Sequence, residues 1–400
     1  MAEHSHSHGH DAGPLDIGRN LERWLSGTAI TLALLTVIGL VSLRPSGEIR
    51  TAASELGLTT ESYPATVESA EAVGCSYDPE AACTRLLVVP LAGPDEGETV
   101  DLGELSRDNA FAPSLSAGDE IILDHEPSTD FYAYADRQRR PALWWLVGLF
   151  AVSVVALGRL RGVAALGSLA ITVAVLGGFV VPAVLDGVDP VAVSVVGASA
   201  IAFVALYLTH GFRVLTTVAL LGTLAALALT LGLAALFFEL AHFTGAVSEE
   251  ATYLPLLSDR IDVAGLLLGG VVLGALGALD DVTVTQAATV WELRRSNPSL
   301  DAAGLFRGGM AVGRSHVGST VNTLLLAYAG ASMPLLLLFV VSGHSLGTVA
   351  NSEVVAVEIV RTLVGSIGLV AAVPLTTWFA ARVAVNATPG DEPAAGHPPA

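Results

Sequence analysis

The chain has 400 residues, of which 52% are hydrophobic and only 14% are charged. Its mean hydropathy of +0.63 is far too high for an ordinary soluble domain, so composition places it among polytopic membrane proteins. The formal net charge of -19 argues against nucleic-acid binding. We therefore expect a mostly α-helical membrane protein that has the lipid bilayer as its main partner.

The first 25 residues are polar, lack an apolar period and are predicted to form a disordered cytoplasmic tail. Histidine occupies alternate positions near its start, at His4, His6, His8 and His10. Alternating histidines could collect a transition metal, but without acidic or cysteine partners they make a weak site, and a solvated tail is the alternative. Residues 386–400 are predicted to form a second disordered cytoplasmic tail.

Residues 26–43 form an uncharged apolar run that is long enough for a first transmembrane helix. We reject a cleaved signal peptide because Arg44-Pro45 follows in place of a small-residue cleavage pattern. The segment 44–140 then changes to the period of short strands, and it carries 19 acidic residues against seven arginines. An acidic, soluble segment of this kind predicts an exposed extramembrane domain.

Within this segment, turn-forming residues separate short runs of strand-forming residues. The predicted strands are Ala65–Val73, Arg85–Leu91, Glu98–Leu102 and Glu120–Asp124. Four or five strands in so short a segment predict a small β-barrel-like domain of the OB or SH3-like kind.

Cys75 and Cys83 are the only cysteines, and they fall in the loop that joins the first two predicted strands. Their spacing does not match a zinc knuckle, and no other cysteine is available to complete a metal site. A disulfide between them is predicted, on the condition that this domain lies outside the cytoplasm.

Hydrophobic runs recur almost without pause after Pro141, and each is long enough to predict a membrane span. With the first span they make about eight, the others being residues 142–158, 163–185, 191–208, 214–238, 263–281, 317–341 and 362–381. Residues 141–385 are thus expected to form a seven-helix transmembrane domain. Arginines gather in the loops on one side, so the positive-inside rule predicts cytoplasmic termini and an outer location for residues 44–140.

The stretch from Ile261 to Pro334 carries the polar groups that fit an apolar environment least. A glycine-laced apolar run ends in two adjacent carboxylates, Asp280 and Asp281, and Thr285 follows in a hydroxyl-rich continuation. Carboxylates at membrane depth are costly unless they face a protein interior or water. A cytoplasmic helix end is the plain alternative, and the sequence leaves both open.

Polar residues also border the last two apolar runs. A basic connector with four arginines, Arg294, Arg295, Arg307 and Arg314, is predicted after the acids. Asn322 and Thr323 then lie at the beginning of the next apolar run. Glu358 and Arg361 precede the last one, and their spacing of three places them on one helix face, where they can pair.

Several long motifs resemble those of the YibE/F family of bacterial multispan membrane proteins. They are Gly274–Asp281, Gly313-Arg314, Val321–Gly330 and Glu358–Gly368 followed by Pro374–Thr377. The resemblance covers roughly residues 44–381. It implies a multispan helical fold in a bacterial plasma membrane, with a small extracytoplasmic β domain near its start, and it implies no settled activity.

The resemblance also assigns individual positions. In the family's pattern an acid stands at Asp281 and an arginine at Arg314. An amide-hydroxyl pair stands at Asn322 and Thr323, and both members of the later acid-arginine pair match as well. The family often has an acid after the Gly-Arg pair, whereas this chain has Ser315-His316, which puts in doubt a carboxylate role there.

No nucleotide-binding loop, serine-histidine-acid arrangement, zinc motif or cysteine nucleophile occurs, so neither an enzyme activity nor a cofactor is predicted. The polar positions favour a transporter or permease for an ion or small solute. Its predicted path is formed by Asp280, Asp281, Thr285, Arg314, Asn322, Thr323, Glu358 and Arg361. The alternative is a membrane scaffold or sensor whose outer β domain binds a partner, and a homo-oligomer or another membrane partner also stays open.

Overall fold

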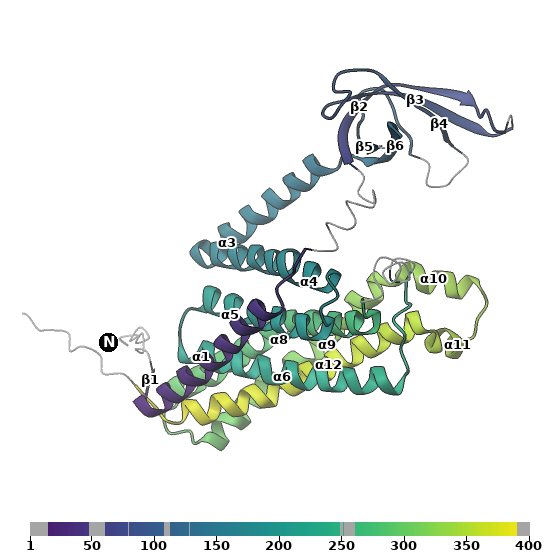
Figure 1. Ribbon diagram of the computed structural model, residues 1–400. Coiled ribbons are helices and arrows are strands. Elements are labelled where there is room, and N and C mark those ends of the chain that lie inside the picture. Colours follow the sequence, from purple (N-terminus) through teal and green to yellow (C-terminus); the bar gives the residue numbers. More distant parts are fainter. Residues whose placement is uncertain are drawn as a thin grey trace, which may run out of the picture. The chain divides into compact units, whose positions relative to one another are not determined.

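The fold was obtained as a computed structural model, and its elements are labelled in Figure 1. The structure describes residues 15–47, 61–78, 80–107, 113–127, 129–248, 251 and 261–389. The chain divides into two compact units. The helical unit comprises Met1–Ser46 and Leu160–Ala400, and the β unit comprises Gly47–Arg159.

The β unit is built on a five-stranded antiparallel sheet with strand order β4-β3-β2-β5-β6. The strands are β2 (Glu61–Gly74), β3 (Ala82–Pro90), β4 (Val100–Ser106), β5 (Glu120–Glu126) and β6 (Phe131–Arg137). Alternate side chains of the three central strands point to one face, as the two-residue period of a strand requires. They form a small core that includes Val67, Val88 and Leu123.

The predicted strands therefore exist, but the predicted OB or SH3-like barrel is not confirmed. The sheet is small and curled (Figure 1), and the strand pairs found among the described residues do not join its two edge strands to each other. Strand β6 was not among the strands with predicted bounds. It begins directly after Asp130, a residue with a positive φ of 52°. A disulfide joins Cys75, just after β2, to Cys83 in β3.

The helical unit contains long apolar helices, most of which pass beside one another (Figure 1). They are α1 (Arg19–Ser42), α3 (Arg140–Val175, shared with the β unit), α4 (Val181–Leu185), α5 (Pro190–His210), α6 (Val214–Leu240), α8 (Val263–Ser296), α9 (Ala302–Ala331), α10 (Met333–Val341), α11 (Leu346–Asn351) and α12 (Glu353–Ala384). A short π-helix, η1 (Leu176–Val180), joins α3 to α4. Helix α8 is central, because it packs against α5, α6, α9 and α12.

The expected number of about eight spans is not confirmed. Among the described residues, six helices are long and apolar enough to cross a membrane, and there are seven if α9 and α10 count as one bent span. The spans predicted at 142–158 and 163–185 belong to one helical stretch, which leaves helical geometry at Arg159 (φ 51°, ψ -128°). The span predicted at 317–341 is instead two helices that bend by 62° at Ser332.

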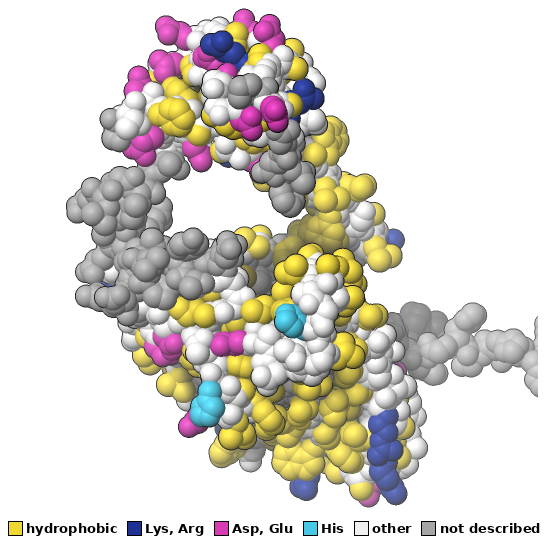
Figure 2. Space-filling model, turned by 90° about the vertical axis from the view of Figure 1, so that its right-hand side faces the viewer, with side chains coloured by type: hydrophobic (Ala, Val, Ile, Leu, Met, Phe, Trp, Pro, Cys, Tyr) yellow, Lys and Arg dark blue, Asp and Glu magenta, His cyan; other side chains and the backbone are white. Residues whose placement is uncertain are grey.

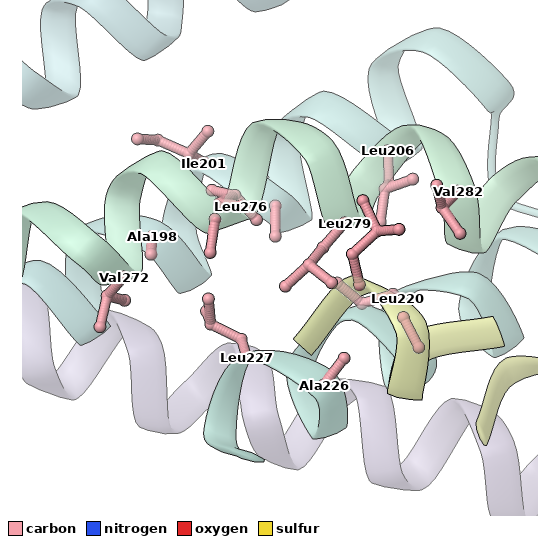
Figure 3. Packing of buried hydrophobic residues seen from close by; sticks show 14 of the residues in the cluster. Ala198, Ile201, Leu206, Leu220, Ala226, Leu227, Val272, Leu276, Leu279 and Val282 are labelled. Carbon is pink, nitrogen blue, oxygen red and sulfur yellow. The ribbon is translucent and has the colours of Figure 1, made fainter. Parts of the chain in front are cut away.

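Hydrophobic side chains from α5, α6, α8 and α12 meet in the largest core cluster (Figure 3). Leu206, Leu220 and Leu279 are fully buried there. Small residues bring the backbones close, as is usual for helices that pack in a membrane. A Cβ on Gly222 of α6, for example, would lie 3.1 Å from the Cβ of Thr376 on α12.

The two chain ends of the helical unit lie together. β1 (Leu15–Ile17) pairs antiparallel with β7 (Ala387–Pro389). Nearby, Arg294 in the last turn of α8 donates hydrogen bonds to the carbonyls of Val385 (3.0 Å) and Ala387 (3.2 Å). We call this the terminal end of the helical unit.

The opposite end, called the distal end, is also tied by polar contacts. Glu353, the first residue of α12, accepts hydrogen bonds from the backbone N–H groups of Thr244 (2.6 Å) and Gly245 (2.7 Å). The hydroxyl of Ser46, after α1, donates to the Asp186 carboxylate at 3.0 Å. Helix α8 therefore begins at the distal end and finishes at the terminal end.

Parts of both predicted tails are ordered. Residues 15–25 form β1 and the beginning of α1, and residues 387–389 form β7. These short strands pair with each other, and a partner from the other end of the sequence cannot be found from local composition. The four histidines of the N-terminal tail lie outside the described residues.

Candidate functional site

Helix α8 carries the two adjacent carboxylates near its middle. The side chain of Asp262 caps its first turn by accepting a hydrogen bond from Gly265 N at 3.0 Å, and the helix continues without interruption to Ser296. Its 34 residues correspond to about 51 Å, well beyond the roughly 30 Å of a bilayer's hydrocarbon core. Asp280 and Asp281 therefore lie within the helix and do not end it.

A cavity of about 970 Å³ lies beside these carboxylates. Its walls come from α3 after Leu160, from α5, from the first turn of α6 and from α8. Asp280, Asp281 and Gly277 line it on α8, and the hydroxyl residues Ser168 and Thr172 face them from α3. At the terminal end, the loop between α5 and α6 forms part of the wall, so the cavity reaches that end of the helical unit.

Basic side chains complete the lining opposite the two acids. Arg161, His210 and Arg213 all border the cavity, and Nδ1 of His210 lies 2.7 Å from the Thr209 hydroxyl. Both Arg161 and Asp281 are close enough to act on His210 electrostatically. The cavity thus presents both signs of charge, a lining suited to a polar or charged solute.

Asp280 differs from Asp281 in its surroundings. Asp281 is exposed to the cavity, whereas Asp280 is half-buried. The Oδ1 atom of Asp280 is fully buried and has no hydrogen-bond partner among the described residues. A buried carboxylate oxygen normally has a donor, so Asp280 can accept a proton or a cation there.

A buried polar seam fixes the opposite face of α8. Gln286 donates from Nε2 to the Gly309 carbonyl of α9 and to the Thr377 hydroxyl of α12, both at 2.7 Å. The hydroxyls of Thr283 and Thr223, the latter on α6, lie 2.6 Å apart, and Thr283 also donates to the Asp280 carbonyl at 3.1 Å. These bonds hold the turn that carries Asp280 against three other helices.

A second polar cluster lies nearer the distal end. Arg361 donates to Glu358 at 2.8 Å within α12, so the expected pair forms. Both residues lie inside the helix, since α12 begins at Glu353 and not at the predicted start of the span. Tyr328 of α9 lies near this pair. We call Tyr328, Glu358 and Arg361 the distal cluster.

Four of the predicted path residues do not join either group. Thr285 is half-buried on α8 but does not line the cavity. Arg314, Asn322 and Thr323 are exposed on α9, and the Thr323 hydroxyl donates to the Ser319 carbonyl of its own helix. The basic connector predicted before them is also shorter than expected, because Arg307 and Arg314 lie within α9.

The cavity residues that sequence reasoning missed are Arg161, His210 and Arg213. In the sequence they stand out only as basic residues between apolar runs, a pattern that indicates the orientation of the spans but not their place beside Asp280 and Asp281. Among the described residues, no group of three or more His, Cys, Asp or Glu side chains is arranged to hold a metal ion.

Comparison with known proteins gives a single finding. No curated protein and no solved structure matches the chain. The family model described as YibE/F-like protein matches residues 146–386, which include the cavity, the polar seam and the distal cluster. The match begins within α3, so the sheet of the β unit, which the resemblance had been expected to cover, lies outside it. Because this match covers more than half of the 400 residues, the chain belongs to the YibE/F-like family.

Proposed function

We propose that the chain is a transporter or permease that moves an ion or small polar solute through the cavity beside Asp280 and Asp281. The observation that carries the proposal is the cavity itself, about 970 Å³ in volume and lined by two carboxylates in the middle of an apolar, membrane-length helix. Ionisable residues at membrane depth are costly, and where they face a cavity they commonly mark a solute or proton path.

Packing does not account for the two acids. The seam residues Thr283 and Gln286 form hydrogen bonds with neighbouring helices, whereas Oδ1 of Asp280 has no partner in the described part of the chain. A carboxylate that only stabilised the bundle would be expected to pair with a donor. Asp280 and Asp281 are therefore assigned to the solute or to a coupling proton, and Arg161 and Arg213 to the opposite charge.

The proposed setting is the plasma membrane of a bacterial cell, with the terminal end in the cytoplasm. Hydrophobic side chains cover much of the helical unit's surface on the face seen in Figure 2, whereas acidic side chains mark the β unit. Basic residues gather at the terminal end, where Arg294 and Arg295 close α8 and Arg382 lies in the last turn of α12. The positive-inside rule then favours an orientation with both chain ends inside and the β sheet outside. This orientation needs an even number of spans, so the stretch Arg140–Leu185 would cross the membrane twice, on either side of its break at Arg159.

Reporter accessibility tests this orientation. A tag inserted near Thr84 in the β unit should be reached only from outside the cell, and a tag near Ser299, between α8 and α9, only from inside. Detection of both tags from one side would overturn the arrangement.

The transport proposal is tested by comparing the ion and small-solute content of cells with and without the chain, followed by uptake into vesicles that contain the purified protein. Uptake should fall to background in Asp281→Asn, while Glu239→Gln should keep wild-type uptake. Glu239 suits this control because it is an exposed carboxylate on α6 that does not line the cavity. Equal solute contents across a broad panel would count against transport.

The second candidate function is a scaffold or sensor in which the β unit binds a partner. The observation that favours it is that the β unit is a separate compact unit with its own core and disulfide. A scaffold should tolerate Asp281→Asn but lose its cellular effect when residues 61–137 are deleted, whereas a transporter should show the opposite dependence.

A further inference from the structure

The first turn of α6 borders the cavity and has no side-chain cap. Arg213 precedes the helix, and its side chain forms no capping hydrogen bond. Among the described residues, the backbone N–H groups of Val214, Leu215 and Thr216 have no acceptor. Leu215 and Thr216 both line the cavity. A helix N-terminus whose N–H groups are free carries a partial positive charge, so this turn favours an anionic group in the cavity.

A buried hydroxyl in the same turn also lacks a partner. Thr216 is fully buried by the protein and lines the cavity, and its Oγ1 atom has no hydrogen-bond partner within the described chain. The next residue shows the usual arrangement, since the Thr217 hydroxyl lies 3.0 Å from the Tyr207 hydroxyl. Buried polar side chains are normally hydrogen-bonded, so the free Thr216 hydroxyl indicates that a ligand supplies its partner.

Two guanidinium groups add full positive charges beside this turn. Arg161 of α3 and Arg213 both line the cavity, and neither takes part in a salt bridge with another described residue. Arginine side chains bind carboxylates and phosphates through paired N–H donors. We call Arg161, Arg213, Thr216 and the free N–H groups of the first turn of α6 the basic pole of the cavity.

The basic pole and the two acids of α8 lie at different depths. The hydroxyls of Thr223 on α6 and Thr283 on α8 are 2.6 Å apart, so the two helices are level there. Thr216 is seven residues from Thr223 toward the terminal end, whereas Asp280 is three residues from Thr283 toward the distal end. The basic pole and the acids are therefore about 15 Å apart along the helix axes. Accordingly, no salt bridge between them is found in the described residues, and each pole stays available for a solute.

These observations rest on the proposed transport function and deepen it by naming a solute class. We infer that the cavity binds an extended zwitterion of the length of a short peptide, with its carboxylate at the basic pole and its ammonium group at Asp280 and Asp281. A simple cation or anion would neutralise one pole and leave the other without a partner. An extended peptide spans about 3.3–3.6 Å per residue, so about three or four residues reach from one pole to the other. The cavity, with about 970 Å³, has room for such a chain.

Titration calorimetry of the purified full chain in micelles tests this assignment with four glycine compounds. Triglycine carries both charges, N-acetyltriglycine lacks the ammonium group, triglycinamide lacks the carboxylate, and glycine carries both charges too close together. Triglycine should bind at least ten times more tightly than each of the other three compounds, because it alone can reach both poles.

Single variants should each remove one part of this preference. Arg213→Gln should abolish the preference for triglycine over triglycinamide and keep the preference over N-acetyltriglycine. Asp281→Asn should do the reverse. Thr216→Val keeps the shape of the side chain and removes the hydroxyl, so it should weaken the binding of triglycine. The control Glu239→Gln should bind all four compounds as the unchanged chain does. Arg213 and Asp281 are exposed, so these two variants are expected to fold.

Two results would overturn the zwitterion site. One is the absence of a preference for triglycine in the unchanged chain, and the other is a preference that survives in both folded charge variants. Uptake of the same compounds by vesicles separates the two proposals. If triglycine binds in the expected pattern but is not taken up, the transport function fails and the site stands. If vesicles take up an inorganic ion while no peptide binds, transport stands and the zwitterion site is wrong.

Discussion

The two sides of α8 carry polar residues in different states. Toward α6, α9 and α12, Thr283 and Gln286 are buried and hydrogen-bonded across the helix contacts. Toward the cavity, Asp281 is exposed and Asp280 keeps a buried oxygen without a partner in the described chain. Hydrogen-bonded polar groups on this helix therefore specify its packing, whereas the two acids are available for a ligand.

The glycines of α8 also differ between its two sides, and their substitution should change the free energy of unfolding most. A Cβ at Gly269 would collide with the Ser194 hydroxyl and lie 3.0 Å from the Pro190 carbonyl, whereas a Cβ at Gly277 meets nothing within 4 Å. Gly269→Ala should lower the free energy of unfolding by about 2–3 kcal/mol. Gly277→Ala should raise it by up to about 1 kcal/mol, because alanine favours the helix.

Unfolding in micelles with a rising fraction of denaturing detergent measures both glycine variants. If both variants shifted the unfolding midpoint in the same direction and by the same amount, the proposed difference between the two sides of α8 would be wrong.

Gln286 should give the next effect. Gln286→Leu removes the buried side-chain hydrogen bonds to the Gly309 carbonyl and the Thr377 hydroxyl, which should cost about 1–2 kcal/mol in the same unfolding assay. Thr285→Val is the matched control, since Thr285 is the neighbouring half-buried hydroxyl residue and its change should shift the midpoint very little. A larger loss from Thr285→Val than from Gln286→Leu would contradict the assignment of the seam.

The smallest effect is expected at an exposed polar contact of the β sheet. In the β unit, a hydrogen bond from Arg85 lowers the pKa of Asp101, and the pair is exposed. Because the folded pKa is lowered, the pair stabilises the fold above the unfolded value of about 3.9 and loses this contribution as the pH falls through the folded pKa.

Arg85→Gln should therefore remove a small part of the acid sensitivity of the β unit, since exposed pairs contribute little. Hydrogen exchange of the β3 and β4 amides in the full chain, measured as the pH is lowered, checks this. A loss of stability in Arg85→Gln as large as that in Gln286→Leu would contradict the small contribution expected of this exposed pair.

Local patterns predicted a large part of the fold. The strands followed from alternation and turn residues, and the apolar helices followed from hydropathy. The extension of α8 beyond Asp281 was left open, because the hydroxyl-rich residues after Asp281 have a weaker apolar signal, which does not show whether a helix continues. The bend at Ser332 was not predicted because hydropathy, which defined the span at 317–341, does not report the direction of a helix.

The candidate site was predicted only in part. Asp280 and Asp281 could be found from the sequence because carboxylates are rare within apolar runs. Arg161, His210 and Arg213 could not, since residues so far apart in the chain come together around the cavity only in the folded protein. Asn322 and Thr323 were predicted because they are polar in an apolar run, but they face away from the cavity on the exposed surface of α9.

Solute uptake by vesicles that contain Asp281→Asn, measured together with the stability of the variant, tests whether the cavity acids are needed for transport. Asn keeps the shape of the side chain and removes its charge, and the Asp281 side chain forms no hydrogen bond or salt bridge among the described residues that the change would break. We expect an unfolding midpoint equal to that of the unchanged protein, together with uptake reduced at least tenfold. Normal uptake by folded Asp281→Asn protein would contradict the assignment of the cavity acids to transport.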